Sequence, residues 1–81
     1  MPKYYFHVRN GDESFKDSEG SVHPSLQKAC TEALRIAREL ARDEEVYTGY
    51  IVSVVDREGY EVATVPVERS ARVSESGSRG R

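Results

Sequence analysis

The sequence predicts an α+β domain of order ββαββ, in which a four-stranded, mainly antiparallel sheet carries one helix on one face. Three observations lead to this prediction. A stretch near the amino terminus alternates apolar and polar side chains, a later stretch repeats alanine at helical spacing, and two stretches rich in β-branched residues follow. Because a single helix covers only one face of such a sheet, the other face is left to solvent or to a partner.

The first strand spans residues 3–9 and divides its side chains between two faces. The face toward the helix receives Tyr4, Phe6 and Val8. The displayed face receives Tyr5, His7 and Arg9. Asn10 and Gly11 follow, and this pair predicts a hairpin turn because both residues accept a positive φ.

A short second strand is expected within residues 13–17, at an edge of the sheet, with Phe15 as its only large apolar side chain. After a turn at Asp17–Gly20, Pro24 and Ser25 mark the start of a helix, with Ser25 as the N-cap. We expect this helix to run from about Leu26 to about Glu44.

One stripe of the helix collects small and apolar side chains, namely Leu26, Ala29, Cys30, Ala33, Ala37, Leu40 and Ala41. The alanines allow the helix to approach the sheet closely, and the charged opposite side is expected to face solvent. Cys30 is the single cysteine, which excludes an internal disulfide, and its place in the stripe predicts that it packs as a small hydrophobic residue.

The third strand is predicted at residues 50–56 and the fourth at 60–67, with turn residues Asp56–Gly59 between them. Pro66 cannot donate a hydrogen bond, so the fourth strand should end there or lie at an edge. The predicted core is Tyr4, Phe6, Val8, Phe15, Tyr50, Val52, Val54, Ala63, Val65 and Val67. The predicted displayed face is Tyr5, His7, Arg9, Ile51, Ser53, Val55, Val62 and Thr64.

The chain has 81 residues, of which 37% are hydrophobic and 32% charged, as in one small globular domain. A domain of this length buries only about 60% of the surface that its unfolded chain exposes, so a large enclosed active-site cavity is not expected. The apolar runs are too short to cross a membrane, and the first residues lack the apolar region of a secretory signal. We therefore expect a cytoplasmic protein without membrane contact.

Charge divides the chain into an acidic part and a basic part. Residues 1–67, the predicted single domain, carry 8 basic and 12 acidic side chains, a net charge of −4. Residues 68–81 carry 4 basic and 2 acidic side chains, a net charge of +2, and contain almost no apolar residue. We expect this segment to be a disordered basic tail.

Several short motifs occur together in a fixed order: Tyr4–Asp12, Asp17–Gly20, Pro24–Leu26, the Ala-rich helix, Asp56–Gly59 and Thr64–Val67. With these motifs the chain resembles short proteins of unknown function that are common in rhizobia and methylobacteria. The resemblance covers about residues 3–67. It implies a coherent fold and a bacterial origin, and it carries no activity.

His7 is the first candidate for chemistry because it lies on the displayed face between Tyr5 and Arg9. No nucleophile and base can be assembled around it, since Cys30 is expected behind the sheet and the position of Ser53 depends on strand order. The acidic turns lack the ligand spacing of an EF-hand, and no glycine-rich loop could hold a phosphate. We therefore predict no enzyme activity, no metal and no cofactor.

The leading hypothesis is a non-catalytic protein-interaction or assembly module that binds through Tyr5, His7, Arg9 and Val55. Exposed apolar area on the uncovered face favours an interface, either in a homodimer made by stacking sheets or pairing edge strands, or with an unidentified protein. The alternative is a weak single-stranded nucleic-acid binder that uses the open face and the basic tail. The acidic domain disfavours it, because phosphate neutralisation dominates affinity for nucleic acid. Strand order, ligand and pathway stay open.

Overall fold

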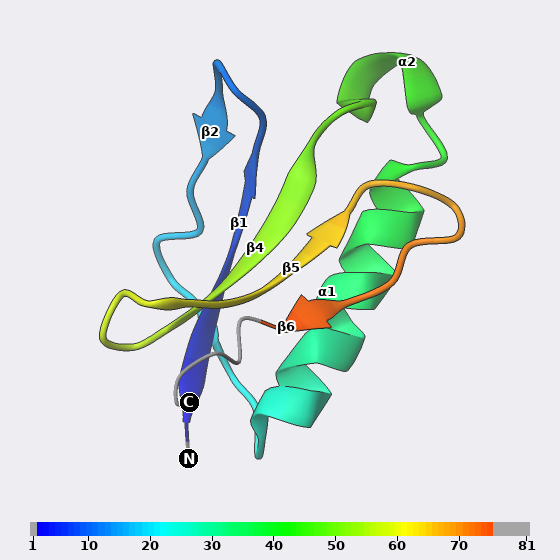
Figure 1. Cartoon of the computed structure of the whole chain (residues 1–81). Helices are drawn as coiled ribbons and strands as arrows, with labels where there is room; N and C mark the ends of the chain where they lie inside the picture. Colours follow the sequence, from blue (N-terminus) through cyan, green and yellow to red (C-terminus); the bar gives the residue numbers. More distant parts are fainter. Residues whose placement is uncertain (1, 76–81) are drawn as a thin grey trace.

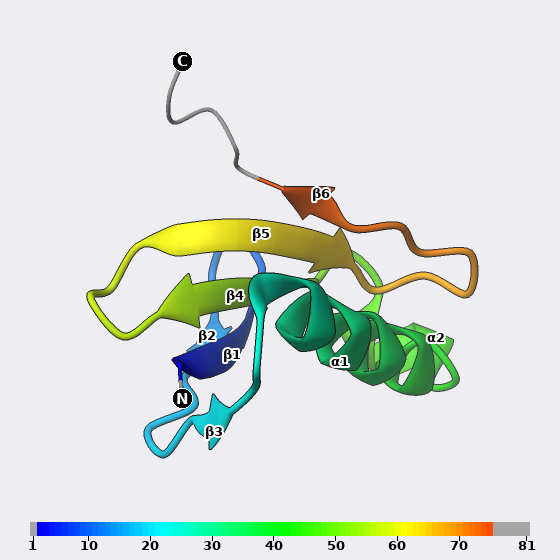
Figure 2. The ribbon, with the colours of Figure 1, turned by 90° about the horizontal axis from the view of Figure 1, so that it is seen from below.

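The computed structural model describes residues 2–75, except for the side chains of Glu44 and Glu45, and shows one antiparallel sheet with a helix on one face (Figures 1 and 2). Its elements are β1 (Lys3–Arg9), β2 (Ser14–Phe15), β3 (Ser21–Val22), α1 (Leu26–Leu40), α2 (Glu44–Tyr47), β4 (Ile51–Asp56), β5 (Glu61–Pro66) and β6 (Ser74–Glu75). The strand order is β2-β1-β4-β5-β6, and β3 pairs with β1. The α+β class with one packed helix is therefore confirmed.

The predicted count of four strands is wrong, because the described sheet has six. The two additional strands, β3 and β6, contain two residues each. So short a strand has no alternating pattern that a sequence could reveal. Two further bounds also differ: β2 has only two residues, and α1 ends at Leu40 before the separate short helix α2.

The turn after β1 forms a hairpin by a different route from the one predicted. Neither Asn10 nor Gly11 has a positive φ. Instead, the side-chain oxygen of Asn10 accepts hydrogen bonds from the backbone N–H groups of Asp12 and Glu13, each at 2.8 Å. Asn10 therefore organises the turn through its side chain, as asparagine does in Asx-turns, rather than through a left-handed backbone.

Helix α1 begins as predicted at the cap residue Ser25, whose hydroxyl accepts a hydrogen bond from the N–H of Lys28 at 3.2 Å. Its stripe of alanines lies against β4 and β5, and Ala29, Ala33 and Ala37 are completely buried. Cys30 is buried in the same layer, and this burial, followed by the carboxylate of Glu75, raises the pKa of its thiol. The predicted packing role of Cys30 is confirmed.

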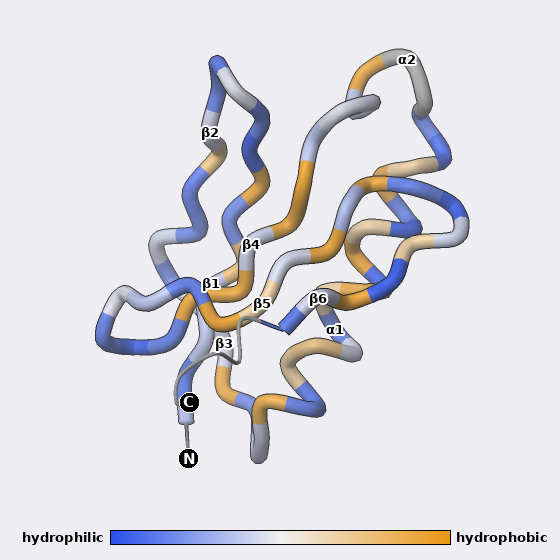
Figure 3. Tube along the Cα trace, in the orientation of Figure 1, coloured by the Kyte–Doolittle hydropathy of each residue, from blue (hydrophilic) through white to orange (hydrophobic). Residues whose placement is uncertain are grey.

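The core lies between α1 and the sheet, where apolar residues follow α1, β4 and β5 in Figure 3. The predicted facing of Val52, Val54 and Val65 is confirmed, because all three are fully buried. Burial of one valine side chain contributes about 1.5–3 kcal/mol, so these three residues are a main source of stability. Of the other predicted core residues, Phe6, Tyr50, Ala63 and Val67 are buried, while Tyr4 and Val8 are partly buried against the core.

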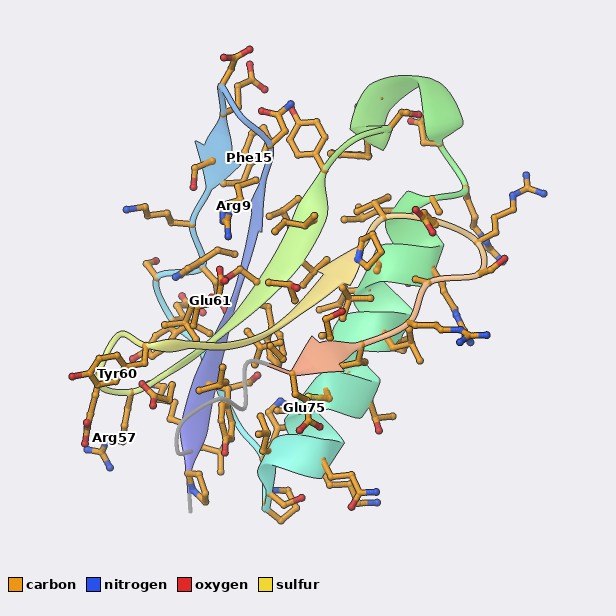
Figure 4. The ribbon with its side chains drawn as sticks, viewed as in Figure 1. Arg9, Phe15, Arg57, Tyr60, Glu61 and Glu75 are labelled. Carbon is orange, nitrogen blue, oxygen red and sulfur yellow. The ribbon has the colours of Figure 1, made fainter. Side chains whose placement is uncertain are left out.

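Phe15 is a correction to the predicted core. It is 54% exposed, and its ring stacks on Tyr50 with centroids 6.1 Å apart. The reason is its position on β2, at the outer edge of the sheet and at the end that α1 does not cover (Figures 1 and 4). Alternation alone indicates which side a residue faces, but not whether the covering layer reaches it.

A β-bulge interrupts the alternation of β5. Val54 pairs with Ala63, but the next residue, Val55, pairs with Glu61, so Val62 is the extra residue. Val62, which the sequence predicts on the displayed face, is partly buried against the core. Glu61 takes the displayed position beside Val55 instead.

The segment after Val67 also differs from its prediction. The sequence predicts disorder from Glu68, but Ala71 is 1% exposed within the core, and β6 pairs with β5 through Ala63↔Glu75 and Thr64↔Ser74. The guanidinium of Arg38 donates to the carbonyl oxygen of Ala71 at 3.3 Å and holds this segment against the helix. The rest of the predicted tail, residues 76–81, lies outside the described residues.

We predict that Gly20→Ala destabilises the domain by about 2–4 kcal/mol, because two costs combine at this position. Gly20 has φ +69°, and an added Cβ would lie 2.8 Å from the ring of Tyr5 and 2.9 Å from the carbonyl oxygen of Tyr4. Gly59→Ala has φ +93° but open space, so it should cost only about 1–2 kcal/mol. Gly11→Ala involves neither a positive φ nor a steric clash, so it serves as the control. Urea unfolding measures all three, and equal losses would contradict the steric argument.

Candidate functional site: the open face of the sheet

Four residues that the sequence proposes for binding lie together on the face of the sheet opposite α1. Tyr5 pairs with Val55 across β1 and β4, and two residues further along β1 His7 pairs with Ser53. Arg9 pairs with Ile51 in the same register. Strand order, which the sequence leaves open, brings these side chains onto one surface, which we call the open face. Their role in binding stays a prediction.

A polar network links three strands at the centre of the open face. The guanidinium Nη2 of Arg9, on β1, lies 2.6 Å from Oε1 of Glu61 on β5. The hydroxyl of Ser53, on the intervening strand β4, donates to the same oxygen at 2.7 Å. Figure 4 shows Arg9 and Glu61 approaching each other over the sheet. Ser53 is only 2% exposed, so the network covers the one buried polar side chain among those that the structure describes.

The carboxylate of Glu61 is set up to stay ionised. Hydrogen bonds from Ser53 and then from Arg9 lower the pKa of its carboxyl group below the ordinary value. The side chains of Arg9 and Glu61 are nevertheless 42% and 39% exposed. The pair therefore presents adjacent positive and negative charges to whatever approaches the open face.

Sequence reasoning missed Glu61, because strict alternation directs it to the same side as Ala63. The bulge reverses this assignment, and no local signal in the sequence gives the position of a bulge within β5. A glutamate at an expected core-facing position could have raised the question, since carboxylates are rarely buried without a partner.

A second polar arrangement holds His7 at the border of the open face. The backbone N–H of Asp17 donates to Nδ1 of His7 at 3.0 Å. The carboxylate of Asp17 in turn accepts three backbone hydrogen bonds, from Phe6 at 3.2 Å, Glu19 at 3.2 Å and Gly20 at 3.0 Å. Burial alone would raise the pKa of Asp17, but these bonds outweigh burial and lower it. The sequence shows Asp17 only as a turn residue.

Next to His7 the surface is hollowed into a shallow depression of about 270 Å³. Its lining residues are Tyr5, His7, Asp17, Ser18, Val55, Asp56, Arg57 and Gly59. Figure 4 places Arg57 at the tip of the hairpin that joins β4 and β5. The rings of Tyr5 and His7 stack with centroids 6.3 Å apart. The lining therefore combines two apolar side chains, Tyr5 and Val55, which we call the floor, with polar groups, which we call the rim.

Ser53 and His7 are opposite each other in the register, which is the arrangement that a nucleophile and its base would require. Their hydrogen bonds lead elsewhere. The hydroxyl of Ser53 donates to Glu61, and Nδ1 of His7 accepts from the backbone of Asp17. No hydrogen bond joins the two side chains within residues 2–75.

Two further findings concern the described residues only. No three His, Cys, Asp or Glu side chains among them gather closely enough to hold a metal ion. Neither α1 nor α2 is long and apolar enough to cross a membrane.

Comparison with known families supports a family assignment. A family model described as a domain of unknown function (DUF6894) matches residues 3–68. The chain belongs to this family. Searches of curated proteins and of solved structures gave no match. The expectation of a domain family of unknown function is confirmed, whereas the narrower link to rhizobia and methylobacteria stays a prediction.

We predict that Asp17→Asn destabilises the domain by about 1–3 kcal/mol at pH 7, because an amide nitrogen cannot accept one of the three backbone N–H groups. The pKa of Asp17 is lower in the folded state than its ordinary value of 3.8. Its stabilisation is therefore complete well above pH 3.8 and is lost as the pH falls through the folded pKa. Urea unfolding at pH 7, 5 and 3 should show the difference between wild type and variant shrinking toward acid.

The control for this prediction is Asp12→Asn, which removes the same charge from the exposed turn after β1. It should change stability by less than about 0.5 kcal/mol at every pH. A loss in Asp17→Asn that does not depend on pH would contradict the role assigned to the ionised carboxylate.

Proposed function

We propose that this domain is a non-catalytic protein-interaction module of the bacterial cytoplasm, and that its open face binds a second copy of the chain. The observation that carries the proposal is the uncovered face of the sheet, which bears partly exposed Tyr5, Ile51 and Val55 around an exposed ion pair. Figure 2 shows α1 on the other side of the sheet. Apolar area of this kind often marks an interface, and small domains gain stability by association.

Edge pairing, the other route to a homodimer, has less support because the outer sides of the long strands β1 and β5 are occupied, and the edge strands β2, β3 and β6 have only two residues each. Along β1, β2 pairs with Val8 and Arg9 and β3 with Lys3 and Tyr4, while between them the N–H of Phe6 donates to Asp17. Along β5, β6 pairs with two residues, and Pro66 has no N–H to offer. Stacking through the open face is thus the route that remains.

The charges of the open face are complementary to themselves. A twofold axis through this face would bring the ion pair of Arg9 and Glu61 in one copy against the same pair in the other. Four alternating charges then satisfy one another, as an isologous interface requires. Such complementarity favours one orientation of the two sheets over others.

Nucleic-acid binding is supported less well. Arg9, the cation expected to contact phosphate, is already paired with Glu61 at 2.6 Å. A phosphate group would have to displace this carboxylate in a domain whose residues 1–67 carry a net charge of −4.

We predict that the wild-type protein sediments as a dimer at tens of micromolar and that Val55→Glu makes it monomeric. The new carboxylate would lie beside Glu61 in a stacked interface, where two like charges in each copy oppose association. Val46→Glu is the matched control, since Val46 is 53% exposed on α2, outside the open face. Sedimentation equilibrium checks the prediction, and a monomeric wild type would refute the homodimer.

Charge reversal tests the orientation of the stacked sheets. Arg9→Glu would place four carboxylates in the interface and Glu61→Arg four guanidinium groups, so each variant alone should be monomeric. A mixture of the two variants should form a heterodimer, because one copy then offers two negative charges and the other two positive charges. Failure of the mixture to associate, with both variants folded by circular dichroism, would contradict the proposed stacking.

A further inference from the structure

We propose that the depression beside His7 binds a carboxylate group attached to a small apolar body. This proposal goes beyond the dimer. The depression lies on the open face toward the hairpin tip and is not lined by Arg9 or Glu61, but it shares Tyr5, His7 and Val55 with the surface that a second copy would cover, so ligand binding and stacking would compete. Four features carry it: a histidine with a fixed tautomer, rim carboxylates already engaged by backbone groups, an arginine without a partner among the described residues, and an apolar floor.

The first feature is the proton position on His7. A backbone N–H only donates, so Nδ1 of His7, which receives the N–H of Asp17, must carry a lone pair. In the neutral ring the proton is therefore on Nε2, and Nε2 is a hydrogen-bond donor. It has no hydrogen-bond partner within residues 2–75. His7 lines the depression, and we infer that this donor serves a ligand bound there.

The second feature is the state of the two rim carboxylates. Asp17 accepts three backbone N–H groups, as described above. Oδ1 of Asp56 accepts from the N–H groups of Glu58 at 2.9 Å and Tyr60 at 3.0 Å, which close the β4–β5 turn. Both side chains therefore serve the fold, and the main groups left to bind a ligand at the rim are donors.

Arg57 supplies the second donor. It lines the depression from the hairpin tip, and its guanidinium has no hydrogen-bond or ion-pair partner within the described part of the chain. Arginine suits a carboxylate because its planar fork of N–H groups matches the two oxygens. The side chain is exposed and long enough to turn over the depression when a ligand arrives.

The apolar floor and the nearby charges indicate which chemical groups the ligand carries besides its carboxylate. Tyr5 and Val55 offer apolar surface, and Nζ of Lys3 lies 5.8 Å from the centroid of the Tyr5 ring. The lining carries two carboxylates, Asp17 and Asp56, and one cation, Arg57, while Lys3 adds a second cation next to Tyr5. Recognition then depends on directed hydrogen bonds and apolar contact, and we expect a dissociation constant on the order of 1 mM.

The test is a titration of the ¹⁵N-labelled full chain with benzoate, followed by the backbone amide signals and the ring nitrogen signals of His7. Benzoate should give saturable shifts confined to residues that line the depression. Benzamide, which has the same shape without the charge, should give shifts at least fivefold smaller at equal concentration. Equal shifts from the two compounds, or shifts spread over the surface without saturation, would overturn the proposal.

Variants decide which donors act. Arg57→Gln leaves the hairpin turn intact and should weaken benzoate binding at least threefold, while Arg42→Gln, on α1's carboxyl-terminal side, should not change it. His7→Phe should abolish benzoate binding. If the His7 substitution also unfolds the protein, Arg57→Gln still tests the site. Equal affinities in Arg57→Gln and Arg42→Gln would refute the role of Arg57.

Two comparisons identify the source of the carboxylate and separate this site from the dimer. N-acetyl-glycyl-phenylalanine should bind more tightly than benzoate if the natural carboxylate is the end of a polypeptide. It should bind more weakly if the natural ligand is a small acid. The same dipeptide with an amide in place of its terminal carboxylate should not bind. The titration is repeated in Arg9→Glu, which is monomeric under the proposed function. Because a stacked dimer would cover Tyr5 and Val55, benzoate should bind this monomeric variant at least as tightly as it binds the wild type. Binding retained there supports the site even if the homodimer fails, and binding lost there refutes the site.

Discussion

The structure depends on the pairing of β1 with β4 at the centre of the sheet. Six consecutive residue pairs, from Tyr4↔Asp56 to Arg9↔Ile51, hold the two strands in one register. Because side chains alternate along both strands, this register places Phe6, Val52 and Val54 under α1 and gathers the polar residues opposite. A slip by one residue would bury His7 and expose Phe6, so the core and the open face are two results of the same constraint.

Asp17 extends that constraint to the edge of the sheet. Its carboxylate receives the N–H of Phe6, at a point where no strand pairs with the outer side of β1, and also closes the turn through Glu19 and Gly20. Its own N–H holds the ring of His7. One residue thus blocks an edge that could pair with another chain, forms the turn and orients a candidate ligand group. Edge protection by an inward-directed charge is a common device against aggregation.

Much of the fold was predictable because it follows from periodic patterns. The alternation of β1, the cap at Ser25 and the facing of Val52, Val54 and Val65 all follow from side-chain spacing. The features that the sequence did not predict share a different origin. The exposure of Phe15 depends on how far α1 extends over the sheet, and the burial of Ala71 depends on a contact with a distant segment. The facing of Glu61 depends on a bulge. Each is decided by tertiary geometry, so the candidate site was predicted only where it lies on regularly alternating strands, at Tyr5, His7, Arg9 and Val55.

The position of Glu61 bears most directly on function. An exposed ion pair contributes only about 0–1 kcal/mol to stability, so stability alone explains little of the bulge that brings Glu61 to Arg9. A pair of opposite charges at the centre of an uncovered face has a larger effect on association, because it penalises partners and orientations that lack the matching charges. Under the proposed dimer, the bulge would therefore do more for the selectivity of the open face than for the stability of the fold. Under the proposed dimer, the apolar residues around the pair supply affinity, and Arg9 and Glu61 select the orientation.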